Sequence, residues 1–361
     1  SWLQDYRTEG FLSRLEYSFA DKYFFSTSIR RDGSSKFHPS VRWGNFWSIG
    51  GGWEISKEKF YTSTWFDYLK LRASYGEVGS DNLNSDYYYW QSFYGIGVNY
   101  GTEPGIRQER IAGNRNLKWE SNQSIDAAIE FKAFNNRFNG VFEVFHRNSD
   151  ALLFNVPLAE SSGRTTQGQN IGSMYNQGIE VQLDGDIIRR EDFRWNSAIN
   201  WTTFKNRITK LPQDAIIDGT KKREVGRSIY DYWLRSYYGV NPENGLELYN
   251  ANLEIDDPDA LDVNGTKVTP NANSAAYHYA GTAIPDFYGS FRNTLTFKDI
   301  SLSFMFMYQF GGMVMDNDYQ SLMHSGTYGR SLHVDALNRW QKPGDITDVP
   351  KRITGISMYD S

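Results

Sequence analysis

Two stretches near residue 300 alternate between apolar and polar side chains for longer than a strand of a soluble protein usually does. They run from Phe287 to Phe297 and from Ile300 to Phe310, and Lys298-Asp299 separates them. Side chains alternate between the two faces of a strand, so the pattern predicts a hairpin with one apolar and one mostly polar face. Each arm has about 11 residues, whereas globular strands average roughly 5–6 and tilted transmembrane strands need roughly 9–11. The length favours an outer-membrane β-barrel.

The same alternation recurs along most of the chain and predicts about ten long strands in all. The other stretches that carry it are residues 14–19, 23–29, 47–55, 69–75, 125–131, 138–146, 179–184 and 193–201. Residues 205–286 read as the largest irregular region, although 232–240 could hold a strand, and residues 313–361 lack a clear alternation.

The predicted connections alternate between short and long. Long polar connections are expected at residues 31–45, 77–118 and 147–175, and short turns between the other strands. Outer-membrane barrels keep short turns on the periplasmic side and long loops outside, whereas alternation alone would also fit a soluble sandwich. The order of the loops therefore favours the barrel.

Composition excludes several classes of protein. The 361 residues include no Cys and carry a net charge of −5. Disulfides and thiolate chemistry are therefore absent, and nucleic-acid binding is not expected of a mildly acidic chain without a basic run. The sequence contains no run of 18 apolar residues, so it predicts no transmembrane helix. The first residues lack the basic start and apolar core of a signal peptide, so we expect that it was removed or that the chain starts within a longer protein.

Several collinear stretches resemble the SusC/RagA family of TonB-dependent outer-membrane transporters of Bacteroidetes-type bacteria. The stretches are RRDGSSKF at 30–37 with RWG at 42–44, LKLRASYG at 69–76, NLKWE at 116–120, NIG at 170–172 with NQGIE at 176–180, residues 281–285 with Asn293, and RW at 339–340 with PG at 343–344. They span nearly the whole chain.

The resemblance implies an all-β fold, a transmembrane antiparallel β-barrel of about 22 strands with a plug in its lumen. All of residues 1–361 would be part of this one barrel domain, and the plug and the C-terminal closing strand would lie outside the chain. It also implies the outer membrane of a Gram-negative bacterium, of the Bacteroidetes type. The expected function is TonB-dependent active import of oligosaccharides or peptides, with a SusD-like surface lipoprotein as partner and TonB acting through the plug. A secreted β-rich glycan-binding or adhesin module and a passive porin are the alternatives.

A barrel would place the apolar face of its strands against lipid and the polar face toward the lumen. The residues predicted to face lipid are Trp47, Trp53, Leu71, Ile129, Trp195, Phe291, Leu302, Phe304 and Phe306. The polar residues predicted to face the lumen, where they could seat a plug or line a path, are Arg72, Glu180, Arg194 and Arg292.

Aromatic residues gather in the long connection after Gly76, where they could stack on sugar rings or grip peptide side chains. The substrate-contact candidates are Tyr87, Tyr88, Tyr89, Trp90, Phe93 and Tyr94. The alternative is that these rings pack against one another and stabilise the loop.

No catalytic motif was found. The five histidines show no H-x-x-x-H or H-E-x-x-H spacing, and neither a G-x-S-x-G elbow nor a P-loop occurs. We therefore expect no enzyme and no cofactor. The one metal candidate is calcium in an acidic loop with Asp256, Asp259 and Asp262, because hard cations prefer oxygen ligands. Its spacing misses the EF-hand pattern, and a solvated surface loop is the alternative.

Overall fold

The structure is a computed structural model that describes residues 5–82, 88–324 and 329–352. The chain divides into two compact units. The first holds Ser1–Ile216, Arg223–Ile229 and Pro285–Gly311, and the second holds Ile217–Lys222, Tyr230–Ile284 and Gly312–Ser361. Among the described residues, no helix combines the length and the apolar character that crossing a membrane requires.

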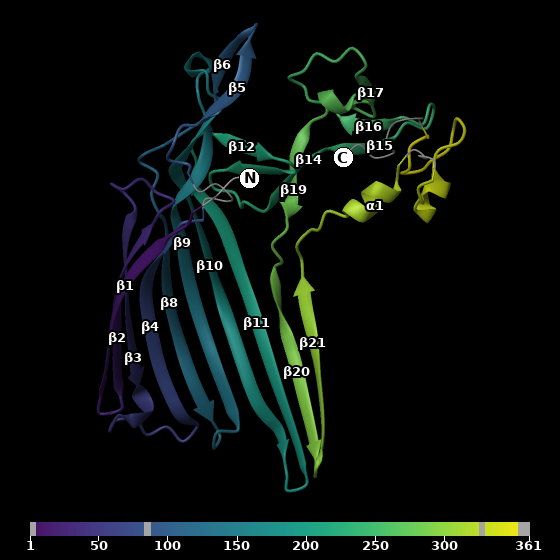
Figure 1. The fold of residues 1–361 in the computed structure, drawn as a ribbon. Helices are drawn as coiled ribbons and strands as arrows, with labels where there is room; N and C mark the ends of the chain where they lie inside the picture. Colours follow the sequence, from purple (N-terminus) through teal and green to yellow (C-terminus); the bar gives the residue numbers. More distant parts are fainter. Residues whose placement is uncertain (1–4, 83–87, 325–328, 353–361) are drawn as a thin grey trace. The chain divides into compact units, whose positions relative to one another are not determined.

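The first unit is built on one large antiparallel sheet whose long strands follow one another in chain order (Figure 1). The strands are β1 (Thr8–Phe19), β2 (Tyr23–Ser34), β3 (Trp43–Glu54), β4 (Phe66–Ser80), β8 (Glu120–Ala133), β9 (Phe138–Pro157), β10 (Thr166–Arg189), β11 (Phe193–Lys210), β20 (Phe287–Phe297) and β21 (Ile300–Phe310). The short β7 (Ile111–Ala112) pairs in parallel with β10. The prediction of an antiparallel all-β fold is confirmed.

All the short connections lie at one end of this sheet, at the foot of the ribbon in Figure 1. They are residues 20–22, 134–137, 190–192 and 298–299, together with 55–65, which carries the 3-10 turn η1 (Ile55–Lys57). Several of their residues have positive φ angles, among them Asp21, Asn135 and Asn136 at 52°, 58° and 57°. Asn and Asp tolerate this left-handed conformation better than other non-glycine residues, so the sequence at these sites suits tight hairpins.

The register places directly paired residues on one face of the sheet. One row of paired residues crosses it from β1 to β21: Phe19, Tyr23, Trp53, Leu71, Ile129, Phe142, Val181, Trp201, Gly289 and Tyr308. The row begins at the short-turn end of β1 and ends near the opposite end of β21. Such a stagger is what the tilted strands of a barrel require.

Two predicted connections contain more strand than expected. Strands β9 and β10 continue through much of residues 147–175. Residues 147–150 and 166–170 are mostly polar, and residues 151–154 are apolar on both faces, so the strict alternation stops while the backbone pairing goes on. The connection after β4 holds the hairpin of β5 (Tyr94–Tyr100) and β6 (Glu103–Gln108).

The region 205–286 also contains several short strands, and the strand suggested for 232–240 is in fact two strands of different sheets. These strands and four short helices complete the described fold. They are β12 (Ala215–Asp218), β13 (Lys221–Glu224), β14 (Asp231–Arg235) and β19 (Tyr277–Thr282) in one sheet; β15 (Tyr237–Val240), β16 (Glu247–Asn250), β18 (Thr266–Thr269) and β17 (Leu261–Val263) in another; and η2 (Glu160–Ser162), η3 (Ala272–Ser274), α1 (Asn317–Leu322) and η4 (Val334–Asn338). In the second unit, Met323, Ala336 and Val349 form a small buried cluster.

Glu58 fixes the connection between β3 and β4 to the neighbouring strands. Its carboxylate accepts hydrogen bonds from the Tyr23 hydroxyl at 2.6 Å, the Trp53 indole N–H at 3.1 Å and the Lys22 ammonium at 3.1 Å. The bond from Tyr23, followed by those from Trp53 and Lys22, holds the pKa of Glu58 below its ordinary value of 4.5.

We predict that Glu58→Gln removes part of the acid sensitivity of this end of the sheet. A carboxyl with a lowered folded-state pKa stabilises the fold above its unfolded pKa and loses that contribution as the pH falls through the folded pKa. Unfolding midpoints in urea between about pH 6 and about pH 3 should therefore fall more steeply for the unmodified protein than for the variant. The exposed turn residue Glu191 supplies the control variant Glu191→Gln, and parallel curves for the protein and Glu58→Gln would contradict the prediction.

Candidate functional site

The apolar face of the large sheet is exposed. Phe291, Leu302, Phe304 and Phe306 are 38%, 58%, 40% and 61% exposed, and Trp47, Leu71 and Ile129 are 46%, 37% and 42% exposed. These exposed fractions show that the other described residues leave the side chains uncovered. Soluble monomers rarely expose contiguous apolar patches larger than roughly 300–600 Å². The surface is therefore built to meet an apolar environment, and lipid contact by these residues stays a prediction.

The two remaining lipid-facing candidates, Trp53 and Trp195, are half-buried, and each donates an indole hydrogen bond to a neighbour. Trp53 donates to Glu58, as described above, and Trp195 Nε1 donates to Asn293 Oδ1 on β20 at 2.9 Å. Asn293 is 3% exposed and lies on the apolar face, since it pairs with Phe304. A buried amide on this face needs a partner, and Trp195 supplies it.

Aromatic pairs form two bands on the apolar face. Near the short turns the pairs are Phe19–Tyr23, Trp53–Phe60, Trp65–Phe134 and Phe66–Phe131; toward the other end they are Phe11–Trp43, Trp47–Tyr75, Trp201–Phe287 and Phe287–Phe310. Transmembrane barrels carry an aromatic girdle at each membrane–water interface, with an apolar band of about 25 Å between them. The two bands have the arrangement of such girdles.

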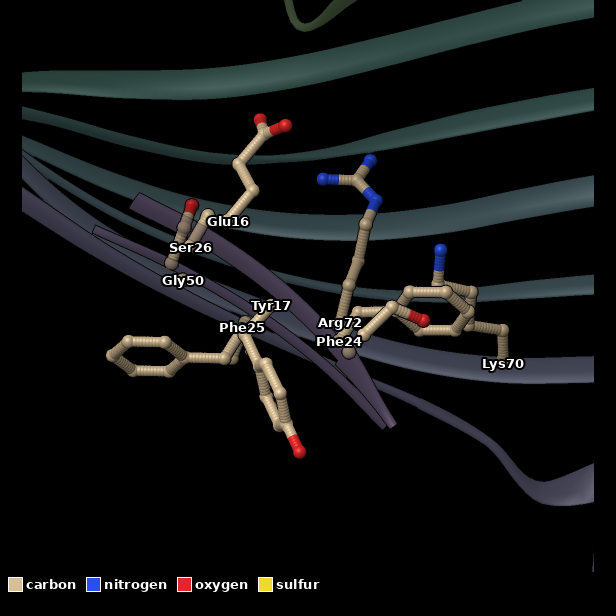
Figure 2. A pocket seen from close by; sticks show the side chains of 13 residues that line it. Glu16, Tyr17, Phe24, Phe25, Ser26, Gly50, Lys70 and Arg72 are labelled. Atoms are coloured by element: carbon tan, nitrogen blue, oxygen red, sulfur yellow. The ribbon is translucent and has the colours of Figure 1, made fainter. Parts of the chain in front are cut away.

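The opposite face of the sheet is polar and charged. Figure 2 shows Glu16, Lys70 and Arg72 projecting from this side of β1 and β4, while Tyr17 and Phe25 project from the other. Arg72 Nε donates to Glu130 Oε1 at 2.8 Å, and its Nη2 donates to Glu143. Lys70 Nζ lies 4.6 Å from the centre of the Phe24 ring. Of the predicted lumen-facing residues, Arg72 thus bridges three strands through two carboxylates that sequence reasoning did not single out.

We predict that Arg72→Met destabilises the protein by about 1–3 kcal/mol, a value between those of exposed and buried ion pairs. The substitution leaves Glu130 and Glu143 without their cation, and Glu180 lies directly opposite Glu143 on β10. Like charges opposite each other on a sheet repel. The measurement is the free energy of unfolding of the full-length protein in lipid vesicles.

The control is Arg292→Met, which removes a cation on the same face that forms no ion pair with any described residue. Adding Glu143→Gln to Arg72→Met should recover part of the loss. Equal stabilities for Arg72→Met and Arg292→Met would mean that the ion pairs of Arg72 with Glu130 and Glu143 do not stabilise the sheet.

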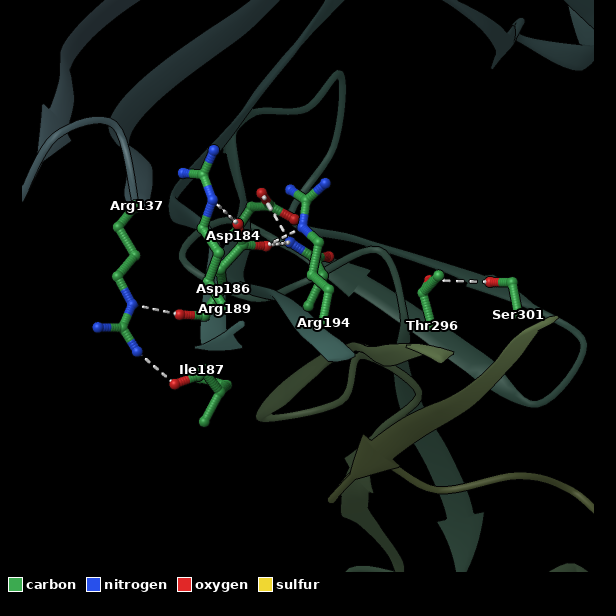
Figure 3. Close-up of polar contacts among 9 residues, drawn as sticks. Arg137, Asp184, Asp186, Ile187, Arg189, Arg194, Thr296 and Ser301 are labelled. Carbon is green, nitrogen blue, oxygen red and sulfur yellow. Dashed lines mark hydrogen bonds and ion pairs between the residues drawn. The ribbon is translucent and has the colours of Figure 1, made fainter. Parts of the chain in front are cut away.

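A second polar cluster holds the short-turn ends of β10 and β11 together (Figure 3). The buried Asp186 carboxylate accepts from Arg194 Nε at 2.7 Å and from Asn196 Nδ2 at 3.2 Å. Arg137, from the turn between β8 and β9, donates to the backbone oxygens of Asp186 and Ile187. The pairing of β10 with β11 shifts between Asp186 and Ile188, so these bonds compensate for a bulge in the ladder.

The aromatic candidates in the long connection separate into buried and exposed rings. Tyr89 is 8% exposed and packs in a core with Phe37 and Leu117, so it is not available at the surface. Trp90 packs edge-on against His38 with ring centres 5.2 Å apart. Both rings thus pack against residues of other segments rather than against other members of the set.

The other rings of this set remain accessible. Tyr88 is half-buried beside Phe93, with ring centres 6.4 Å apart, and Phe93 and Tyr94 are 38% and 55% exposed. Tyr87 lies outside the described residues. Phe93 and Tyr94 are the members of the set best placed to meet a ligand.

The acidic loop of the second unit places Asp256, Asp259 and Asp262 at the surface. Asp262 Oδ1 accepts the Gly265 N–H at 2.9 Å, which closes a turn. The neighbouring Asp257 accepts from the Thr269 hydroxyl and from the Asp259 N–H, and these bonds, the first above all, hold the pKa of Asp257 below its usual value. Among the described residues, no group of three or more His, Asp or Glu side chains is arranged to hold a metal ion. Calcium binding stays a prediction without geometric support.

Comparison with known proteins gives a consistent result. The model of a family described as TonB dependent receptor-like, beta-barrel matches residues 3–304. TonB-dependent receptor P3 of Formosa agariphila is 30% identical to the chain, with 100% of this chain and 38% of that receptor covered. TonB-dependent receptor SusC of Bacteroides thetaiotaomicron is 34% identical over 66% of this chain and 26% of its own length.

Solved structures agree with the sequence relatives. The structure of the RagAB peptide transporter superposes with a TM-score of 0.81 at 27% identity, covering 98% of this chain and 38% of that one. The RagAB peptide importer in its open-open state gives a TM-score of 0.83 at 26% identity with the same coverage. The chain spans less than two fifths of the length of these relatives.

Proposed function

The chain belongs to the family of TonB-dependent receptor β-barrels, and from this membership we propose that it forms part of the barrel wall of an active importer in the outer membrane of a Gram-negative bacterium. The observation that carries the proposal is the continuous apolar face of the large sheet, with aromatic bands near both of its ends. Relatives from Formosa and Bacteroides support a Bacteroidetes source.

The connections give the wall its orientation. Barrels of this class keep short turns in the periplasm and long loops outside the cell. The turn holding Asp21 would then face the periplasm, and the aromatic connection between β4 and β8 would face the medium. The polar side of the sheet, with Arg72 and its carboxylates, would face the lumen and a plug formed by another part of the protein. TonB would act through that plug.

The proposed cargo is an oligosaccharide or a peptide, delivered by a SusD-like surface lipoprotein. RagAB is named as a peptide transporter and a peptide importer, which supports a peptide cargo, whereas the resemblance to SusC keeps oligosaccharide open. Phe93 and Tyr94 would contact the cargo, since exposed rings stack on sugars and on peptide side chains. The chain would do no covalent chemistry, in keeping with relatives that are named as receptors and transporters.

The test uses the full-length protein in its own cells. Deleting its gene is expected to abolish uptake of labelled oligosaccharide or peptide, and deleting TonB should have the same effect. A lipoprotein should co-purify after extraction with detergent. Uptake that persists without TonB would favour a passive porin. Recovery of the folded protein from the medium without detergent would favour a secreted glycan-binding or adhesin module.

A further inference from the structure

A row of polar and cationic side chains crosses the apolar face of the sheet at the end away from the short turns. His146 on β9 pairs with Gln177 on β10, and Gln177 pairs with Lys205 on β11, so the three side chains share one face. His146 Nδ1 lies 3.4 Å from Gln177 Oε1. Arg207, two residues beyond Lys205, is exposed on the same face.

Directly beside this row the apolar face is hollowed. Its lining includes the apolar side chains of Ile125, Ala127, Val144 and Ile179, and the row of His146, Gln177 and Lys205, with Thr203, forms its polar edge, called here the rim. Ala127 is exposed and carries only a methyl group, which leaves room between the larger side chains. An apolar floor with a polar and cationic rim suits a ligand that is part hydrocarbon and part anion.

The rim carries free positive charge. The Lys205 side chain makes no hydrogen bond or ion pair with any residue that the structure describes. Arg207 donates to the backbone oxygen of Gly226, which leaves other donors of its planar fork available. Both cations lie beyond Trp201 of the aromatic band, at the height where lipid head groups begin.

We propose that this hollow binds one phosphorylated glycolipid of the outer leaflet, a lipid of the lipid A class. An acyl chain lies over Ala127, Val144 and Ile179, and a head-group phosphate meets Lys205 and Arg207, with Gln177 and His146 as hydrogen-bonding neighbours. The site is continuous with the lipid-facing surface, so it rests on the orientation proposed above. The site would bind one particular lipid, whereas the rest of the lipid-facing surface would contact any lipid of the bilayer.

Native mass spectrometry of the full-length protein in a mild non-ionic detergent tests the site by titration with diphosphoryl hexa-acyl lipid A. Lys205→Gln is expected to weaken binding about fivefold, the change that corresponds to about 1 kcal/mol for one basic group at an anionic surface. Ala127→Phe fills the hollow from an exposed position and should weaken binding by a similar factor. The control Lys298→Gln removes an exposed cation at the short-turn end and should leave the affinity unchanged.

Three results would overturn the site: no lipid bound to the unmodified protein, the same affinity for Lys205→Gln and Lys298→Gln, or no effect of Ala127→Phe. If inorganic phosphate at about ten times the lipid concentration displaces the lipid, the site recognises an anion alone and is not a lipid site. A negative result for the lipid site would not contradict the proposed transport function, because the detergent and uptake experiments do not depend on Lys205.

Discussion

Arginine in place of Phe304 is expected to destabilise the protein by about 2–4 kcal/mol, whereas arginine in place of Ser303 should cost less than about 1 kcal/mol. The two residues are neighbours near the middle of β21 and project from opposite faces, since Phe304 pairs with Asn293 and Ser303 with Thr294. If the apolar face meets hydrocarbon, Phe304→Arg places a charge near the centre of the bilayer. Ser303→Arg places it on the polar side.

The measurement is the free energy of unfolding of the full-length protein in lipid vesicles, titrated with guanidinium chloride. Both variants share the strand, the height and the new side chain, so their difference reports the environment of each face. Equal costs for the two variants would mean that the apolar face does not meet lipid. A larger cost for Ser303→Arg would reverse the assignment of the faces.

Gly289→Ala should be the most damaging small substitution in the sheet, with a loss of more than about 3 kcal/mol. A Cβ atom at Gly289 would lie 1.9 Å from the backbone oxygen of Asn200 and 2.7 Å from the Tyr308 hydroxyl. Tyr308 pairs with Gly289 and donates to that same oxygen at 2.7 Å, so it reaches across β20 to β11 only because Gly289 has no side chain. Alanine would have to part the strands or expel the tyrosine.

The control is Gly51→Ala, a strand glycine at which a Cβ atom would meet nothing nearer than the Phe24 oxygen at 4.0 Å. Tyr308→Phe keeps the ring and removes the hydroxyl, and it should cost about 1 kcal/mol, the usual net contribution of one hydrogen bond. Folded yield and the thermal midpoint in detergent measure all three variants. Equal midpoints for Gly289→Ala and Gly51→Ala would refute the close-packing argument.

The faces of the long strands could be predicted from the sequence, because the apolar alternation and the pairing register of the sheet both repeat every two residues. Trp53, Leu71 and Ile129, chosen from three separate stretches, fall in one row of paired residues. The alternation could not reveal where strands end. β9 and β10 continue beyond the apolar band through residues in which apolar and polar side chains no longer alternate, and there the backbone pairing marks the strands.

The site was less predictable because its contacts depend on which strands are neighbours. Arg72 could be assigned to the polar face, but Glu130 and Glu143 become its partners only once β4, β8 and β9 are paired in register. The aromatic residues of the long connection have similar chemistry, and nothing local distinguishes Tyr89, which fills a small core, from Tyr94, which is 55% exposed. That distinction comes from Phe37 and Leu117, which are distant from them in sequence.

The grouping of every short turn at one end of the sheet has a consequence for biogenesis. In the proposed orientation, each long connection, including the 211–286 stretch between β11 and β20, has to be carried through the bilayer before its strands can pair. Moving each Asp, Lys or Arg of that stretch through hydrocarbon costs roughly 2.5–3.5 kcal/mol. We therefore expect unassisted insertion to stall at this stretch, and the proposed orientation implies a machine that opens an aqueous path for the loops.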